Sequence, residues 1–103
     1  MDLTIHERLL LLNLLPPEGD LTTIRIVRKL REALSFTEDE IAEHKVQVSP
    51  EGNVRWEHDA PKPIELGAKA REIAVKALEA LDKAGSVTEQ HLSLFDKFGV
   101  GLD

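Results

Sequence analysis

The chain has no cysteine, so it can form no disulfide framework, no thiol nucleophile and no thiolate metal site. Aromatic residues are also few, with three phenylalanines, one tryptophan and no tyrosine. The leucine-rich run at residues 9–15 is far too short to cross a bilayer, and acidic Asp2 and Glu7 precede it where a signal peptide carries basic residues. We therefore expect a cytoplasmic protein that does not enter a membrane.

Basic charge is in short supply, because 13 lysines and arginines face 19 acidic residues and leave a net charge of -6. Nucleic acids and anionic membranes attract basic surfaces, so neither is the expected partner. A length of 103 residues with 42% hydrophobic residues suits one folded domain with one core. We predict a single domain over residues 1–103, of which residues 99–103 form a frayed tail.

Helical periodicity and end signals predict five helices. Thr4 with Glu7 and Thr37 with Glu40 have the spacing of a capping box, and Gly85 is placed to end a helix in a left-handed conformation. In the last helix we expect the core-facing side chains to be Leu92, Phe95 and Phe98. The predicted helices span residues 4–15, 21–34, 37–44, 68–84 and 88–98. The fourth helix has an alanine-rich stripe that we assign to the core: Ala70, Ile73, Ala74, Ala77, Leu78 and Leu81.

Between the third and fourth helices the apolar period changes to two. Val46 and Val48 alternate with polar residues, as do Val54 and Trp56, and the turn 49–53 between them has proline early and glycine late. This pattern predicts a β-hairpin. Residues 64–66 alternate in the same way and are a possible third strand that pairs with the hairpin. The predicted fold class is α+β, a helix-rich single domain with a small antiparallel β element.

Three helices followed by a hairpin, over residues 4–57, is the element order of a winged helix, whose third helix enters the DNA major groove. Here that helix would meet phosphates with the wrong sign, because it carries Glu38, Asp39, Glu40 and Glu43. A nucleic-acid-binding regulator is therefore a third hypothesis, and a protein partner is favoured over DNA.

The first helix is apolar on nearly every face, which requires burial all round, either at the centre of the domain or against another subunit. We assign Leu9, Leu12 and Leu15 to this buried or dimeric face, and Trp56 to an anchor in the core or an interface. The leading hypothesis is a small interaction module that forms a homo-oligomer, with a dimer favoured, and binds a protein partner.

A small-ligand or nucleotide binder is the second hypothesis. Trp56 and His58 would stack on the ligand, and Arg25 and Arg28 would contact its phosphates. Glu40 and His44 lie four residues apart and could share a metal, but no third ligand is evident, so we predict no metal site. No nucleotide-binding or nucleophile motif is present. We therefore predict no cofactor, no catalytic residue and no enzymatic activity.

Several short strings resemble a type of small open reading frame found in tailed-bacteriophage genomes. They are ERLLL at 7–11, LLP at 14–16, IVRKLR at 26–31, LSF at 34–36, VRW at 54–56 and IEL at 64–66, with Leu78, Leu81, Gly85, Thr88 and Leu92 further on. The resemblance covers nearly the whole chain and transfers no catalytic residue. It implies a phage or prophage protein that acts inside a bacterium, on a host protein or defence pathway.

Overall fold

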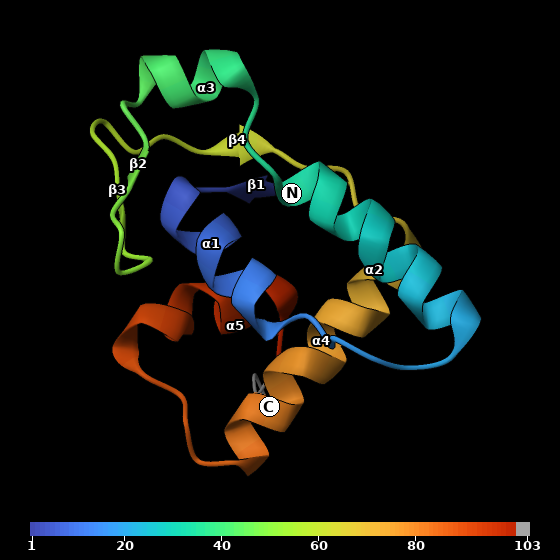
Figure 1. The fold of residues 1–103 in the computed structure, drawn as a ribbon. Coiled ribbons are helices and arrows are strands. Elements are labelled where there is room, and N and C mark those ends of the chain that lie inside the picture. The colour runs from blue at the N-terminus through green and yellow to red at the C-terminus, as the bar shows by residue number, and fades with distance from the viewer. Residues whose placement is uncertain (101–103) are drawn as a thin grey trace.

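Helix α1 (Ile5–Leu14) lies in the middle of the structure, and α2 (Leu21–Leu34), α4 (Ala68–Lys83) and α5 (Leu92–Phe98) pack around it (Figure 1). This computed structural model describes residues 1–100. The buried apolar side chains of these elements form one cluster: Leu3, Leu11, Leu15, Val27, Leu30, Leu34, Ile64, Ala74, Leu78, Leu94, Phe95 and Phe98. With five α-helices and two small antiparallel sheets in the described residues, the predicted helix-rich α+β class is confirmed.

The helix starts follow local capping signals. The amide of Glu7 donates to the Thr4 hydroxyl at 3.1 Å while the Thr4 amide donates to the Glu7 carboxylate at 2.9 Å. Thr37 and Glu40 repeat this capping box at the start of α3 (Glu38–Glu43). Such reciprocal bonds satisfy amides that the helix itself leaves unpaired. Both predicted starts are confirmed, and helix α4 ends just before Gly85, whose φ of +68° is the predicted left-handed stop.

The C-terminal helix differs from the prediction in its first turn. A 3-10 turn, η1 (Glu89–His91), precedes α5 and changes which side chains face the core. Leu92 is 53% exposed, so its predicted place in the core is wrong, and Leu94 lies there instead, with Phe95 and Phe98 as expected. Within the expected tail, Val100 packs against the core and residues 101–103 lie outside the described residues.

The hairpin is confirmed, but the third strand is not where the sequence predicts it. Strand β2 (Gln47–Val48) pairs with β3 (Val54–Arg55), and Gly52 in the turn has a φ of +88°. Strand β4 (Lys62–Pro63) pairs with β1 (Asp2–Leu3) at the N-terminus and not with the hairpin. The reason is burial, since this pairing carries Leu3 and Ile64 into the core cluster. The predicted strand at 64–66 is therefore wrong in both its position and its partner strand.

Residues 35–63, which we call the arm, contain no buried residue. The arm comprises α3, the β2–β3 hairpin and the connector to β4, and lies along the top and left of Figure 1. The helix order of a winged helix is present, yet α3 does not pack as the third helix of the bundle, because α4 occupies that position. No helix among residues 1–100 is long and apolar enough to span a membrane.

Candidate protein-docking surface

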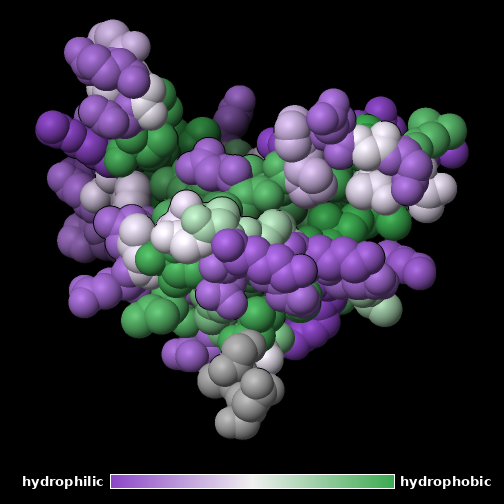
Figure 2. Space-filling view, turned by 90° about the horizontal axis from the view of Figure 1, so that it is seen from below, coloured by the Kyte–Doolittle hydropathy of each residue, from purple (hydrophilic) through white to green (hydrophobic). Residues whose placement is uncertain are grey.

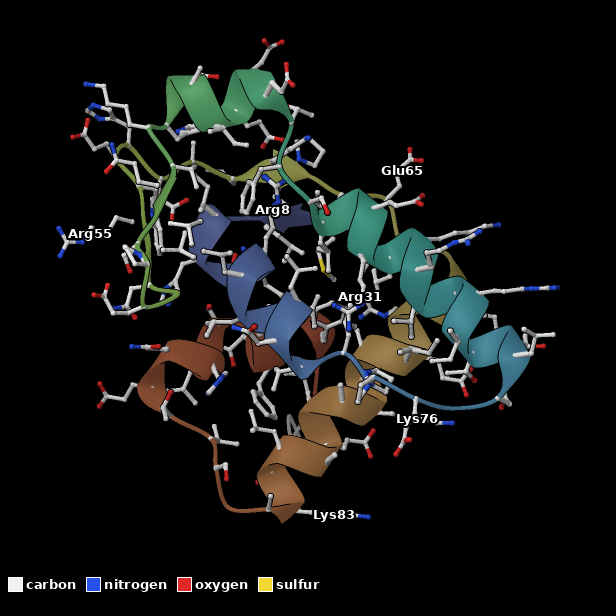
Figure 3. The ribbon with its side chains drawn as sticks, viewed as in Figure 1. Arg8, Arg31, Arg55, Glu65, Lys76 and Lys83 are labelled. Atoms are coloured by element: carbon white, nitrogen blue, oxygen red, sulfur yellow. The ribbon has the colours of Figure 1, made fainter. Side chains whose placement is uncertain are left out.

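Arg8 is the most deeply buried charged residue of the described chain, and it joins the arm to the helices (Figure 3). Its Nε donates to the carbonyl of Leu34 at 3.1 Å, and its terminal nitrogens bind the carbonyl of Ser35 at 2.6 Å and the carboxylate of Glu40 at 2.5 Å. The guanidinium also lies 4.2 Å from the centre of the Phe36 ring. Every direction around Arg8 is thus occupied by protein, so its role is structural.

Glu40 completes this network. Lys62 donates to its second oxygen at 2.9 Å, and the hydrogen bond from Arg8, with a further one from Lys62, lowers the pKa of Glu40 to about 2. His44, four residues on, turns its Nδ1 to the carbonyl of His58 at 2.7 Å. The structure does not assemble these residues into a metal site, and residues 1–100 contain no group of three side chains placed to hold a metal.

A second buried charge, Glu7, pairs on the other side of α1. Lys97 of α5 donates to its carboxylate at 2.6 Å and to the carbonyl of Asp2 at 2.8 Å. Burial raises the pKa of Glu7, but the hydrogen bonds from Lys97 and from Thr4 outweigh it and hold the pKa below its usual value. This carboxylate is therefore ionised, and its ion pair with Lys97 holds α5 against α1.

The segment that follows β3 supports the fold more than it forms a pocket. Asp59 accepts hydrogen bonds from the amides of Ile5 at 2.7 Å and His6 at 3.3 Å, so it caps α1 from a distant part of the sequence. Trp56 is half-buried with its ring 5.7 Å from that of His6. His58 is exposed and has a positive φ of 55°. The tryptophan thus belongs to the arm and contacts the first turn of α1 through His6.

The residues of the ligand hypothesis are not brought together. Arg25 and Arg28 are exposed on α2, whereas Trp56 and His58 follow β3, and in Figure 1 these two elements lie on opposite sides of α1. The space beside Trp56 is lined instead by hairpin residues, among which Arg55 points away from the body (Figure 3). A joint site for a stacked base and its phosphates is not present in this conformation.

The three leucines of the first helix lie in different surroundings. Leu15 is 4% exposed and belongs to the core cluster, and Leu12 is partly buried against it. Leu9 is half-buried. The apolar character of α1 is thus explained largely by its central position, and a docking surface has to be sought elsewhere.

A groove runs between α2 and α4, apolar at its two ends and more polar in the middle, and we call it the α2–α4 groove. It consists of three adjoining hollows of about 370, 320 and 300 Å³. The first two share Ile26 and Lys69, and the last two share Thr23, Ile73 and Lys76, so they form one continuous depression. Viewed from below, Figure 2 shows hydrophobic surface open between hydrophilic side chains.

Small side chains make the groove. On α4, Ala70 and Ala77 lie on the stripe that the sequence assigns to the core, yet only Ala74 and Leu78 of this helix are fully buried. Because alanine fills little of the space that faces α2, a depression with an apolar floor remains. The stripe was visible in the sequence, but its partial exposure was not.

Lysines border this floor. Lys29 lies on the α2 side, and Lys69 and Lys76 lie on the α4 side, where they share Glu72 at 4.0 and 3.3 Å. Lys29 makes no ion pair with any residue from 1 to 100, and Glu65 is the other carboxylate at the upper end. Asp20 lines the middle hollow as well, so three lysines and three carboxylates (Asp20, Glu65 and Glu72) border the groove, and its charges balance.

No protein-family model, no curated protein and no solved structure matches this chain. The resemblance to short bacteriophage proteins stays a prediction. Function is therefore inferred from the α2–α4 groove.

Proposed function

We propose that this chain is a small protein-interaction module that binds a protein segment in the α2–α4 groove. The observation that carries the proposal is the continuous groove between two helices, which is open to solvent, has mainly apolar linings at its two ends, and is bordered by charged side chains. A groove of this kind matches the way in which proteins bind an amphipathic helix, with apolar anchors below and charged residues at the edge.

The carboxyl groups whose pKa values are shifted favour binding over catalysis. The carboxyls with lowered pKa values are Glu7, Asp20 and Glu40, and each is engaged in a helix cap or an ion pair. A catalytic acid or base needs a perturbed group free to meet a substrate in a cleft. The bacterial host protein expected from the sequence remains the predicted partner class.

Photo-crosslinking tests the proposal. A benzoylphenylalanine replaces Ala33 or Ala80, which are exposed residues at the two ends of the groove, in a chain expressed in bacteria. Ala60, exposed in the arm connector, serves as the matched control. We expect discrete crosslinked products from the two groove positions and none from the control. The absence of any groove-specific product from correctly folded protein would contradict the proposal.

A further inference from the structure

Two histidines form hydrogen bonds through the same ring nitrogen, Nδ1, but in opposite roles. The Nδ1 of His91, in η1, accepts a hydrogen bond from the Thr88 amide at 3.0 Å, and the Thr88 hydroxyl lies at the same distance. An amide N–H can only donate, so this Nδ1 carries no proton. The Nδ1 of His44, at the end of α3, faces the carbonyl of His58 at 2.7 Å. A carbonyl can only accept, so this Nδ1 carries a proton.

A second proton on the imidazole affects the two bonds differently. A neutral ring has one donor and one acceptor nitrogen, whereas an imidazolium donates from both. His44 keeps its bond in either form, and a positive charge is favourable at the C-terminal end of a helix. A protonated His91 would turn an N–H toward the N–H of Thr88. It would also place a positive charge at the N-terminal end of η1 and α5, where the helix dipole disfavours it.

The bond to His91 closes the first turn of the C-terminal helical segment. Thr88 is the N-cap residue of η1 and His91 is the third residue after it, where Glu or Gln usually completes a capping box. The amides of a first turn have no partner within the helix, so the imidazole supplies an acceptor that the segment otherwise lacks. The rest of α5 is held in the core by Leu94, Phe95 and Phe98. Loss of the cap therefore frees η1 and not the whole of α5.

The charged groups around η1 are engaged elsewhere. No carboxylate of residues 1–100 forms an ion pair with His91, which is half-buried. Helices α1 and α4 pack against α5, where Glu7 is bound by Lys97, and Arg71 donates to a carbonyl at the end of α5. The other charged side chains of η1 and α5 are exposed: Glu89 and Asp96. An imidazolium at His91 thus has no ion-pair partner that would offset the lost cap.

We propose that His91 is a pH-sensitive helix cap, which holds η1 closed while its imidazole is neutral and lets η1 unwind when the ring takes up a proton. Imidazoles change charge between about pH 5 and 8. Because the closed turn excludes the second proton, the cap stabilises η1 at the upper end of this range and is lost as the pH falls through it. Glu7 and Glu40 have lowered pKa values, so both stay ionised in this range and the arm and α5 remain docked.

Nuclear magnetic resonance of the isotope-labelled chain between pH 8 and 5 tests this inference. We expect the amide proton of Thr88 to move upfield as its bond is lost, with the same midpoint as the ring protons of His91. The amides of His91 and Leu92, which bond within η1, report whether the turn opens. Their protection from hydrogen exchange, corrected for the intrinsic rate at each pH, should fall by about fivefold, the effect expected for a lost cap.

Two variants separate this cap from other effects of pH. His91→Gln keeps a side-chain acceptor but cannot titrate in this range, so the Thr88 amide should no longer respond to pH. His44→Gln is the matched control and should retain the response. A Thr88 amide in the unmodified chain that does not change between pH 8 and 5, or whose midpoint differs from that of the His91 ring, overturns the inference whether or not a variant folds. An undiminished response in folded His91→Gln overturns it as well.

Discussion

The helical body and the arm are stabilised by different kinds of interaction. The body, formed by α1, α2, α4 and α5, buries a continuous apolar cluster, whereas the arm over residues 35–63 buries no residue at all. The arm is positioned by polar bonds, chiefly Arg8 with Glu40 and Asp59 with the start of α1. Apolar burial gives cohesion in proportion to area, while hydrogen bonds are directional and add little net stability each. The arm should therefore separate from the body without unfolding it.

The single tryptophan makes this difference measurable. Trp56 lies in the arm and its ring approaches His6 of α1, so its fluorescence reports the docking of the arm. Far-UV circular dichroism reports mainly the helices of the body. The proposed function depends on this division, because the groove belongs to the body.

The largest expected effect comes from Arg8→Met, which keeps an apolar stem but removes the charge. The variant leaves the carbonyls of Leu34 and Ser35 without their side-chain donor, and Glu40 keeps only its bonds from Lys62 and the Thr37 amide. Breaking one side of a buried ion pair costs about 3–5 kcal/mol, and we expect a loss of this size in urea unfolding. The matched control is Arg28→Met on α2, an exposed residue whose replacement should cost less than about 0.5 kcal/mol. Equal losses of stability in the two variants would show that the bonds of Arg8 to Ser35 and Glu40 do not stabilise the fold.

The second prediction compares an apolar truncation in each region. Leu78, on α4, is 0% exposed, and Leu78→Ala should lower the free energy of unfolding by about 3 kcal/mol and shift fluorescence and circular dichroism together. Val48, in the hairpin, is 68% exposed, and Val48→Ala should change stability by less than about 0.5 kcal/mol. A large loss of stability in Val48→Ala would mean that apolar packing in the hairpin stabilises the fold. The proposed difference between body and arm would then be wrong.

The third prediction uses two aspartates that cap helices. Asp59→Ala removes the cap that the arm supplies to α1, and Asp20→Ala removes the cap that accepts from the Thr23 amide at 2.7 Å in α2. Each should cost about 1 kcal/mol. Only Asp59→Ala should also alter the Trp56 emission, because only that cap joins the arm to the body. An equal fluorescence change in both variants would contradict this assignment.

The helices could be predicted from the sequence because their signals are local. Thr4 with Glu7 and Thr37 with Glu40 act within one turn, and Gly85 acts at a single φ. The features that sequence analysis missed all join residues far apart. The pairing of β1 with β4 and the burial of Arg8 against Glu40 depend on which elements meet, and periodicity carries no such information.

The candidate site illustrates the same limit. The alanine-rich stripe of α4 was visible in the sequence and was assigned wholly to the core. The groove exists because the alanines of α4 fill little of the space beside Ile26 of α2 and Ile73 of α4. The tryptophan and the arginines of α2, in contrast, were chosen for their chemistry, and the fold places them on opposite sides of α1.

The smallest structural change is expected in acid. The pKa of Glu40 is lowered from 4.5 to about 2, so its ion pairs stabilise the docked arm fully above pH 4.5 and this contribution is lost as the pH falls toward 2. We expect Trp56 emission to change within this window while most of the helical signal remains. Glu40→Gln should show the loosened emission already at neutral pH and no transition in the window.

Glu7 requires a separate control, because its pKa is also lowered and its pair with Lys97 weakens in acid as well. Glu7→Gln removes that titration from the body and leaves the arm network intact, so it should retain the acid transition of Trp56. If the fluorescence and helical signals of the unmodified chain change together, and do so equally in Glu40→Gln, the arm does not dock as a unit through Glu40. If instead the Trp56 fluorescence changes while the helical signal does not, α3 can be released from Arg8 while the α2–α4 groove stays formed.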